Sequence, residues 1–215
     1  CVHSDISDGF KVVNNVPILI SDKVTDTVFS PKSIDSYVAR KKDSLFVKII
    51  RSMTNGDVAQ TKKNCMTFID LLKEDRDTSE VLIIGSGEKG NGIDSMVENG
   101  SLVITGTDVY LSDNVDYVSD AHYLPFKSNS FDAVWIQAVL EHVIEPKKVV
   151  SEIHRVLRRD GYVYAETPFM QQVHEGAYDF TRYTVLGHRY LFESFKLIKM
   201  GGINGAGSAL AWSID

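Results

Sequence analysis

Short apolar runs alternate with helical or turn segments between residues 81 and 166, and this alternation constrains the fold more than any other feature of the chain. The runs that predict strands are residues 81–84, 102–108, 116–120, 131–136 and 162–166. A helix is predicted from Pro146 to Gly161, and its apolar face consists of Val149, Ile153, Val156 and Leu157. Strands separated by helices of this size form βαβ units, in which the strands are parallel. The sequence therefore predicts an α/β fold, a doubly wound, mostly parallel sheet with helices on both faces.

The first 75 residues follow a different pattern. Residues 10–13 and 16–20 are β-branched runs, and the Asn14-Asn15 pair between them is typical of a tight hairpin turn. Apolar residues three and four positions apart then predict a helix over residues 33–53 and another over about 58–73. The buried side of the second helix is predicted to carry Cys65, Phe68, Ile69 and Leu72. We therefore expect an N-terminal extension of residues 1–75, a hairpin and helices that act as a cap or lid, and a domain of residues 76–215.

The C-terminal end of the chain is less regular. A strand is predicted over residues 195–200 from its apolar residues. Glycines at 201, 202, 205 and 207 follow, and they predict a flexible stretch. We therefore expect one strand here and an irregular or missing strand after it.

Composition excludes several classes of protein. Apolar residues make up 43% of the chain and charged residues 24%, as in ordinary globular domains. The formal net charge of −6 argues against nucleic acid as a partner. No run approaches the roughly 18 apolar residues of a transmembrane helix and no signal peptide opens the chain, so we expect a cytoplasmic protein without a membrane partner. Cys1 and Cys65 make no disulfide framework, and the sequence predicts no metal site.

A glycine-rich turn and an acid frame the first two strands of the alternating region. Gly85, Gly87 and Gly90 follow the strand at 81–84, and glycine lets the backbone turn sharply and approach a ligand closely. Asp108 closes the next strand, where a carboxylate can accept both hydroxyl hydrogens of a ribose. The spacing matches the dinucleotide fingerprint G-x-G-x-x-G. This motif alone therefore leaves NAD and S-adenosylmethionine open, and its glycines alone also fit a simple tight turn.

Motifs further along the chain are more specific. The stretches FDAVWIQAVLEHV at 131–143 and EIHRVLRRDG at 152–161 are ones that dehydrogenases do not normally carry. Asp120-Ala121, Leu-Pro-Phe at 124–126 and Glu-Thr-Pro at 166–168 stand in order with them. Over roughly residues 78–170 this series resembles the class I S-adenosylmethionine-dependent methyltransferases, in particular the methyltransferase type 11 group. The resemblance implies a Rossmann-like fold, an enzyme that transfers a methyl group, and S-adenosyl-L-methionine as its cofactor.

The resemblance also implies roles for single residues in cofactor binding. Asp108 would hold the ribose hydroxyls, Asp120 would accept a hydrogen bond from the adenine amino group, and Gln137 would lie near the sulfonium through its main chain. The full set implied is Gly85, Ser86, Gly87, Asp108, Val109, Asp120, Ala121 and Gln137. The chain departs from the family at two positions: Ile83 stands where many members have an acid, and Lys89 lengthens the glycine turn by one residue.

His142 is the first candidate for a catalytic group. It follows the fourth predicted strand, where cofactor and acceptor should meet, and histidine titrates near neutral pH. A general base is needed when the acceptor must lose a proton, as a hydroxyl must. The alternative for His142 is a residue at a helix start that hydrogen-bonds the backbone. Glu141 beside it is more often a solvated or structural carboxylate in such a position.

The segment at 169–183 follows the fifth predicted strand and is polar and aromatic, and long loops in compact domains tend to be functional. His174 is a second candidate base. Arg182 could clamp a phosphate or carboxylate, unless it pairs with Asp179 to stiffen the loop. The candidate substrate-binding residues are Glu175, Tyr178, Arg182 and Tyr183.

The sequence as a whole predicts an S-adenosylmethionine-dependent methyltransferase with a small-molecule acceptor, a sugar-linked or phosphate-bearing one being favoured over nucleic acid. One alternative is an NAD-dependent oxidoreductase, which the literal G-x-G-x-x-G supports. The other is a non-catalytic cofactor-binding module on the same fold, suggested by Ile83.

Overall fold

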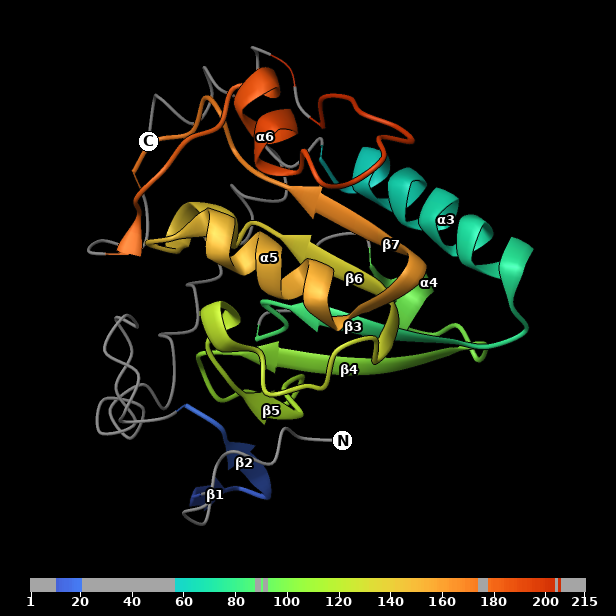
Figure 1. Cartoon of the computed structure of the whole chain (residues 1–215), viewed down its shortest axis with the longest axis vertical. Helices are drawn as coiled ribbons and strands as arrows, with labels where there is room; N and C mark the ends of the chain where they lie inside the picture. Colours follow the sequence, from blue (N-terminus) through green and yellow to red (C-terminus); the bar gives the residue numbers. More distant parts are fainter. Residues whose placement is uncertain are drawn as a thin grey trace, which may run out of the picture.

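The computed structural model describes residues 11–20, 57–87, 90, 93–173, 178–203 and 205, and these form one seven-stranded sheet in the order β1-β2-β5-β4-β3-β6-β7 (Figure 1). The strands are β1 (Lys11–Val13), β2 (Val16–Ile18), β3 (Ser79–Ile84), β4 (Leu102–Asp108), β5 (Tyr117–Val118), β6 (Phe131–Gln137) and β7 (Leu157–Glu166). Only β1 and β2 are antiparallel among the neighbouring pairs described. The predicted α/β fold with a mostly parallel sheet is confirmed.

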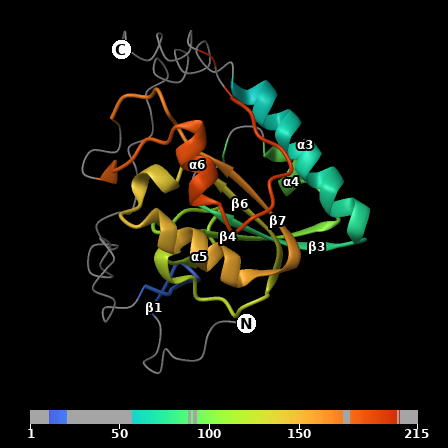
Figure 2. The same ribbon diagram turned by 45° about the horizontal axis from the view of Figure 1, so that its top comes forward.

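Helices cover both faces of the sheet. The described helices are α3 (Asp57–Asp75), α4 (Asp94–Val97), α5 (Pro146–Val156) and α6 (Val185–Leu191), with short 3-10 helices η1 (Ala121–Tyr123) and η2 (Leu140–His142). Helix α5 packs on one face, and α3 with α4 on the other, as Figure 2 shows from a second direction. The arrangement is the doubly wound one that the sequence predicts. None of the described helices is long and apolar enough to cross a membrane.

Helix α3 lies where the 58–73 prediction places it, and its buried side chains are the predicted ones. Cys65 is fully buried, and Phe68, Ile69 and Leu72 are at most 5% exposed, in one cluster with Trp135 of β6. Cys65 is thus a small core residue, and burial raises the pKa of its thiol, which keeps it protonated and unreactive.

The N-terminal hairpin forms as predicted and joins the same sheet. Asn14 and Asn15 have φ angles of 49° and 67°, the left-handed values of a type I′ turn. Ile18 of β2 then pairs in parallel with Val118 of β5. The predicted helix at 33–53 lies outside the described residues, and the division into an extension of residues 1–75 and a domain of residues 76–215 stays a prediction.

Two predicted boundaries are wrong. Helix α5 ends at Val156 and not at Gly161, since Leu157 is already extended and opens β7. The reason is tertiary: Asn129 and Ser130 donate to the carbonyls of Arg155 and Val156, and the chain then pairs with β6. The predicted strand at 195–200 is also wrong, because these residues form no ladder with any described strand.

Candidate functional site

The glycine turn that follows β3 is held tightly between β4 and β6. Gly85 has a φ angle of +82°, and a Cβ atom there would lie 2.3 Å from Cγ2 of Val139, so only glycine fits. The N–H groups of Gly85 and Ser86 donate to the carbonyl oxygen of Thr107 at 2.9 and 3.1 Å. The turn therefore takes its shape from the neighbouring strand ends.

Asp108 closes this turn from the side of β4. Its Oδ2 accepts a hydrogen bond of 2.8 Å from the Gly87 N–H, and its Oδ1 accepts one of 3.1 Å from the Tyr110 N–H. A Cβ at position 87 would lie 2.7 Å from Oδ2, so the backbone approaches the carboxylate as only glycine allows. Val109 beside it packs partly buried in the cluster of β2 and β5. The structure thus brings Gly87 and Asp108 together, while their predicted roles toward the cofactor stay predictions.

Gln137 bounds the turn from the side of β6. Its Oε1 lies 2.5 Å from the place of a Cβ on Gly90 and accepts the indole N–H of Trp135 at 3.4 Å. Strand β3 has β4 on one side and β6 on the other, so the chain reverses its direction of winding between β3 and β6. The carboxyl ends of the strands at such a switch point form the usual ligand crevice of open α/β sheets.

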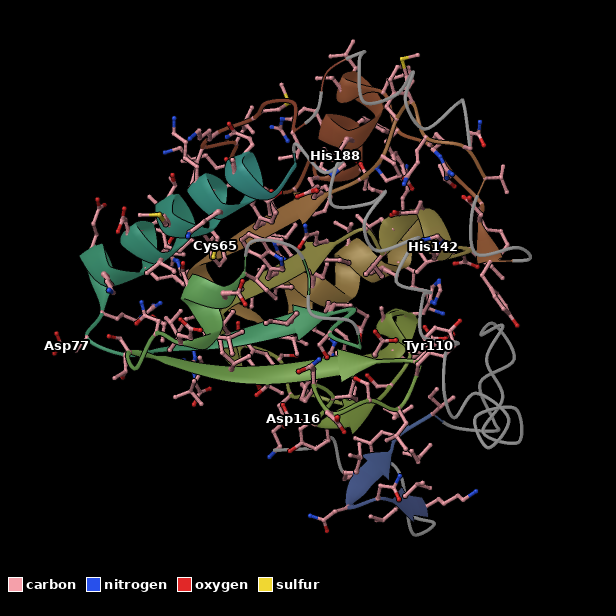
Figure 3. All side chains as sticks on the ribbon, turned by 180° about the vertical axis from the view of Figure 1, so that it is seen from behind. Cys65, Asp77, Tyr110, Asp116, His142 and His188 are labelled. Carbon is pink, nitrogen blue, oxygen red and sulfur yellow. The ribbon has the colours of Figure 1, made fainter. Side chains whose placement is uncertain are left out.

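Figure 3 shows where this edge lies in the molecule: Tyr110 and His142 are at the ends to which β4 and β6 point, and Asp77 is at the opposite edge. Asp120 and Ala121, at the end of β5, are 5% and 7% exposed. Oδ1 of Asp120 accepts from the backbone N–H of His122 at 2.9 Å and contacts its Nδ1 at 2.6 Å. Asp120 thus already caps η1, and its predicted contact with adenine stays a prediction.

His142 ends η2 with its ring fixed by the backbone. Its Nδ1 lies 2.6 Å from the carbonyl oxygen of Tyr178. Since a carbonyl oxygen only accepts hydrogen bonds, Nδ1 carries the hydrogen and Nε2 is left as the acceptor. The side chain is 20% exposed. Nδ1 therefore bonds the backbone, as in the alternative given for His142. In the neutral ring Nε2 carries the lone pair that the predicted base requires.

Glu141 is buried, which excludes the solvated carboxylate and leaves the structural one of the two interpretations given above. Its side chain is 0% exposed, and neither carboxylate oxygen has a hydrogen-bond partner in another of the described residues. Burial raises the pKa of Glu141 to about 7; Asp179 and Glu166 add to this rise, and Arg182 opposes it. The signal in the sequence was its position between Leu140 and Val143, both of which are buried.

The segment at 178–183 packs over Glu141. The N–H groups of Phe180 and Thr181 donate to the Glu141 carbonyl oxygen at 2.8 and 3.3 Å. Tyr183 is half-buried against the core on the side of α5, and burial raises the pKa of its phenol. Tyr178, also partly buried, packs in the cluster with β2 and β5. His174 and Glu175, the other predicted residues of this loop, lie outside the described residues.

Arg182 holds the loop together through all five N–H bonds of its guanidinium. It pairs with both carboxylate oxygens of Asp179 and donates to the carbonyl oxygens of Gln171, Gln172 and Thr181. The side chain of Asp179 is only 2% exposed. The arrangement observed is the alternative in which Asp179 and Arg182 stiffen the loop. The clamp for a phosphate stays a prediction, and it would require these bonds to open.

Two further residues near this edge received no role from the sequence: Tyr164, and Glu166, which was noted only as part of the Glu-Thr-Pro motif. Tyr164 donates from its hydroxyl to Oε2 of Glu166 at 2.8 Å and accepts from Asn64 of α3 at 3.2 Å. Its ring stacks on Trp135 at 3.8 Å between centroids. Alternation along β7 was the available signal, since Tyr164 and Glu166 fall on the same face of the strand. No three His, Cys, Asp or Glu side chains group as a metal site within the described ranges.

Comparison with known protein families gives a match over the central part of the chain. Residues 82–165 match the family model described as methyltransferase domain. The demethylmenaquinone methyltransferase of Clavibacter sepedonicus is 37% identical over 90 residues, which are 40% of this chain and 35% of the relative. The ubiquinone/menaquinone biosynthesis C-methyltransferase UbiE of Saccharophagus degradans is 28% identical over 120 residues, 49% of this chain and 45% of the relative. The chain thus spans between about a third and a half of these relatives.

Solved structures give more distant likenesses. The YcgJ protein of Bacillus subtilis has 18% sequence identity and a TM-score of 0.46, covering 60% of this chain and 67% of its own. A putative S-adenosyl-L-methionine-dependent methyltransferase of Methanococcus maripaludis has 17% identity and a TM-score of 0.43 over the same shares of the two chains.

Proposed function

We propose that this chain, whose residues 82–165 match the model of the methyltransferase domain family, transfers the methyl group of S-adenosyl-L-methionine to a small-molecule acceptor. The observation that carries the proposal is the closure of the glycine turn on Asp108, with the Gly87 N–H 2.8 Å from the carboxylate. This places a fixed acid and a glycine-rich turn at the switch point of the sheet, where a nucleoside-bearing cofactor would bind. The wider motif series supports a methyltransferase over a dehydrogenase.

The residues at the crevice suit that cofactor. Asp108 is half-exposed at the end of β4 and would hold the ribose hydroxyls, and Gln137 would border the methionine part with Gly85 and Gly87. When bound, S-adenosyl-L-methionine supplies a methyl group on a positively charged sulfur. The half-exposed carboxylate of Glu166, at the end of β7 next to Gln137 on β6, favours a positive charge at this edge. Ile83 is buried in the sheet between Gly106 and Trp135, so it contributes packing and no charge.

Catalysis of a methyl transfer is mostly orientation of the acceptor in line with the methyl group. Nε2 of His142 would take the proton of an acceptor that must lose one, while Nδ1 keeps the ring oriented on the Tyr178 carbonyl. The half-buried rings of Tyr178 and Tyr183 and the segment at 178–183 would shield the acceptor from water. His174 and Glu175 are proposed on the sequence alone.

The charges near His142 bear on the class of acceptor. Glu166 and Asp179 lie near Glu141, and the guanidinium of Arg182 is used within its own loop. An acceptor with an uncharged hydroxyl or ring, such as a sugar-linked one, meets no repulsion there, whereas a phosphate would. One relative is named as a demethylmenaquinone methyltransferase and the other as a ubiquinone/menaquinone biosynthesis C-methyltransferase, and an uncharged quinone also fits this description.

Calorimetric titration with S-adenosylhomocysteine and with NAD tests the proposal. We expect binding of S-adenosylhomocysteine, and we expect Asp108→Asn to weaken it at least about tenfold, because one charged acceptor for the ribose is lost. Asparagine keeps an oxygen for the Gly87 N–H, so the turn should persist. Asp113→Asn, an exposed acid in the following loop, is the matched control and should leave binding unchanged. Binding of NAD alone, or an unchanged dissociation constant for Asp108→Asn, would contradict the proposal.

A further inference from the structure

Glu141 and His142 are adjacent in η2. Oε1 of Glu141 lies 3.8 Å from Nε2 of His142. This distance is too long for a hydrogen bond but short enough for strong interaction between charges in a buried site. Glu141 is fully buried, and its carboxylate oxygens have no hydrogen-bond partner in any other residue that the structure describes, which is costly for an anion and unusual for a structural carboxylate.

We propose that Glu141 and His142 form a coupled pair that holds one proton between them, with Glu141 as the residue that sets the charge of the His142 ring. The pair exists in one of two forms when it holds this proton: neutral glutamic acid beside neutral imidazole, or carboxylate beside imidazolium. The inference rests on the proposed function only where the pair serves catalysis, since the coupling itself is argued from the proximity of the two groups and the burial of Glu141.

The hydrogen bond of Nδ1 makes Nε2 the site of the shared proton. Nδ1 stays a donor to the Tyr178 carbonyl oxygen at 2.6 Å in both charge states of the ring. Nε2 is therefore the only ring atom that gains or loses a proton, and it is the atom that faces Glu141. A proton on Nε2 produces a cation directly beside the carboxyl group.

Besides His142, the charged groups that act on Glu141 are Arg182, Asp179 and Glu166. From the segment at 178–183, Arg182 and Asp179 face it, but they neutralise one another in a bidentate pair. From the end of β7, Glu166 faces it with the same sign of charge. Tyr183 faces it as a neutral phenol. Arg182 thus favours the Glu141 anion only in part, and a proton on Nε2 of His142, 3.8 Å from Oε1, would favour it further.

The pair gives the proposed transfer a definite proton path. The acceptor O–H bond breaks and its proton passes to Nε2 of His142, while the oxygen electron pair forms a bond to the methyl carbon and the carbon–sulfur electrons remain on sulfur. The imidazolium formed then faces the Glu141 carboxylate, which stabilises it. The competent form is therefore the pair without its proton, and transfer should increase with pH through the loss of that proton.

The test is an NMR titration of the His142 ring in the full-length protein, from about pH 5 to about pH 9. The ring signal is assigned by its loss in His142→Gln. We expect Glu141→Gln to move the ring's titration midpoint down by about one pH unit, because the anion that favours imidazolium is gone. Glu98→Gln, an exposed acid at the end of α4 on the far face, is the matched control and should not move it. An unmoved midpoint in folded Glu141→Gln overturns the pair.

A second measurement on the wild-type protein covers the case in which Glu141→Gln does not fold. With 13C at the side-chain carboxyl carbon of glutamate, Glu141 and the His142 ring should change together in a common step. A Glu141 signal that titrates alone near its ordinary value overturns the pair. The calorimetric titration with S-adenosylhomocysteine is interpreted separately. If Glu141 and His142 titrate in a common step but the protein binds no S-adenosylhomocysteine, the coupled pair is supported and the proposed function is contradicted.

Discussion

At the scale of single residues, the buried carboxyl group of Glu141 makes the free energy of unfolding depend on pH. Its pKa is about 7 in the folded chain against 4.5 in the unfolded one, so between these values the unfolded chain has already lost a proton that the folded chain keeps. The free energy of unfolding therefore decreases as pH rises from about 4.5 to about 7 through this group.

Glu141→Gln should remove that decrease. We expect the variant to gain about 3 kcal/mol relative to the wild type between pH 4 and pH 8, since each unit of pKa difference corresponds to about 1.4 kcal/mol. Urea unfolding of both proteins at the two pH values measures the change, and any constant cost of the amide cancels. Glu98→Gln should show no such dependence, and an equal change in both variants would contradict the assignment.

Gly85 is the second residue whose local geometry makes a sharp prediction. Gly85→Ala should lower the free energy of unfolding by about 2 kcal/mol or more, because a left-handed φ disfavours alanine and the new Cβ meets Val139. It should also weaken S-adenosylhomocysteine binding, since the turn must shift. Thermal unfolding and calorimetry measure both effects. The matched control is Gly100→Ala, where a Cβ has open space and both quantities should stay near the wild-type values.

At the scale of elements, the segment at 178–183 depends on Arg182. Arg182→Lys removes the bidentate pair with Asp179 and the bonds to the carbonyls of Gln171 and Gln172. We expect the amides of Phe180 and Thr181, which bond to Glu141, to exchange with deuterium at least about tenfold faster. Arg159→Lys, at a side chain that is 96% exposed, is the control. Unchanged exchange would show that the loop is held by other contacts.

The elements that the sequence predicted correctly are those with local signals. The Asn14-Asn15 turn demands a hairpin by its own backbone preference, and the spacing of Cys65, Phe68 and Leu72 places one face of α3 in the core. The end of α5 had no such signal. Gly161 looked like a helix end, but the pairing of Leu157 with Phe131 determines where the strand begins.

The candidate site divides in the same way. The meeting of Gly87 with Asp108 could be predicted, because parallel strands bring their carboxyl ends to one edge. The burial of Glu141 could be predicted only in part: its apolar neighbours Leu140 and Val143 indicate the core, but the covering segment at 178–183 lies far along the chain and folds back over it. The bonds of Arg182 could not be predicted, because their acceptors are backbone carbonyls whose positions only the folded loop defines.

At the scale of the whole molecule, the two edges of the sheet contribute differently: the amino ends of the strands carry stabilising ion pairs, and the carboxyl ends carry the candidate site. At the amino end, Asp132 is 2% exposed and pairs with Arg76 and Arg158 at 2.9 and 2.8 Å, and it accepts from the Glu80 N–H. These contacts connect α3, β3, β6 and β7 on the edge opposite to the glycine turn. A substitution at this edge should therefore lower the free energy of unfolding without changing the affinity for a ligand at the opposite edge.

Asp132→Asn should destabilise the fold by about 2 kcal/mol, because hydrogen bonds to charged groups are lost at a buried position. The dissociation constant for S-adenosylhomocysteine and the titration of His142 should not change under conditions where the variant is folded. Urea unfolding, calorimetry and the NMR titration measure the three quantities. A tenfold loss of binding in the folded variant would show that the two edges are coupled.

Trp135, stacked on Tyr164 in the interior, is an intrinsic fluorescent probe of the candidate site. Trp135 is 1% exposed, and its indole N–H donates to Gln137, the residue that borders the glycine turn. Trp135 therefore fluoresces from a site that aqueous quenchers such as iodide do not reach. One hydrogen bond, to Gln137, connects this ring to the crevice. A ligand that moves Gln137 therefore changes the intensity and colour of that emission, and occupancy can be followed in a cuvette without any label.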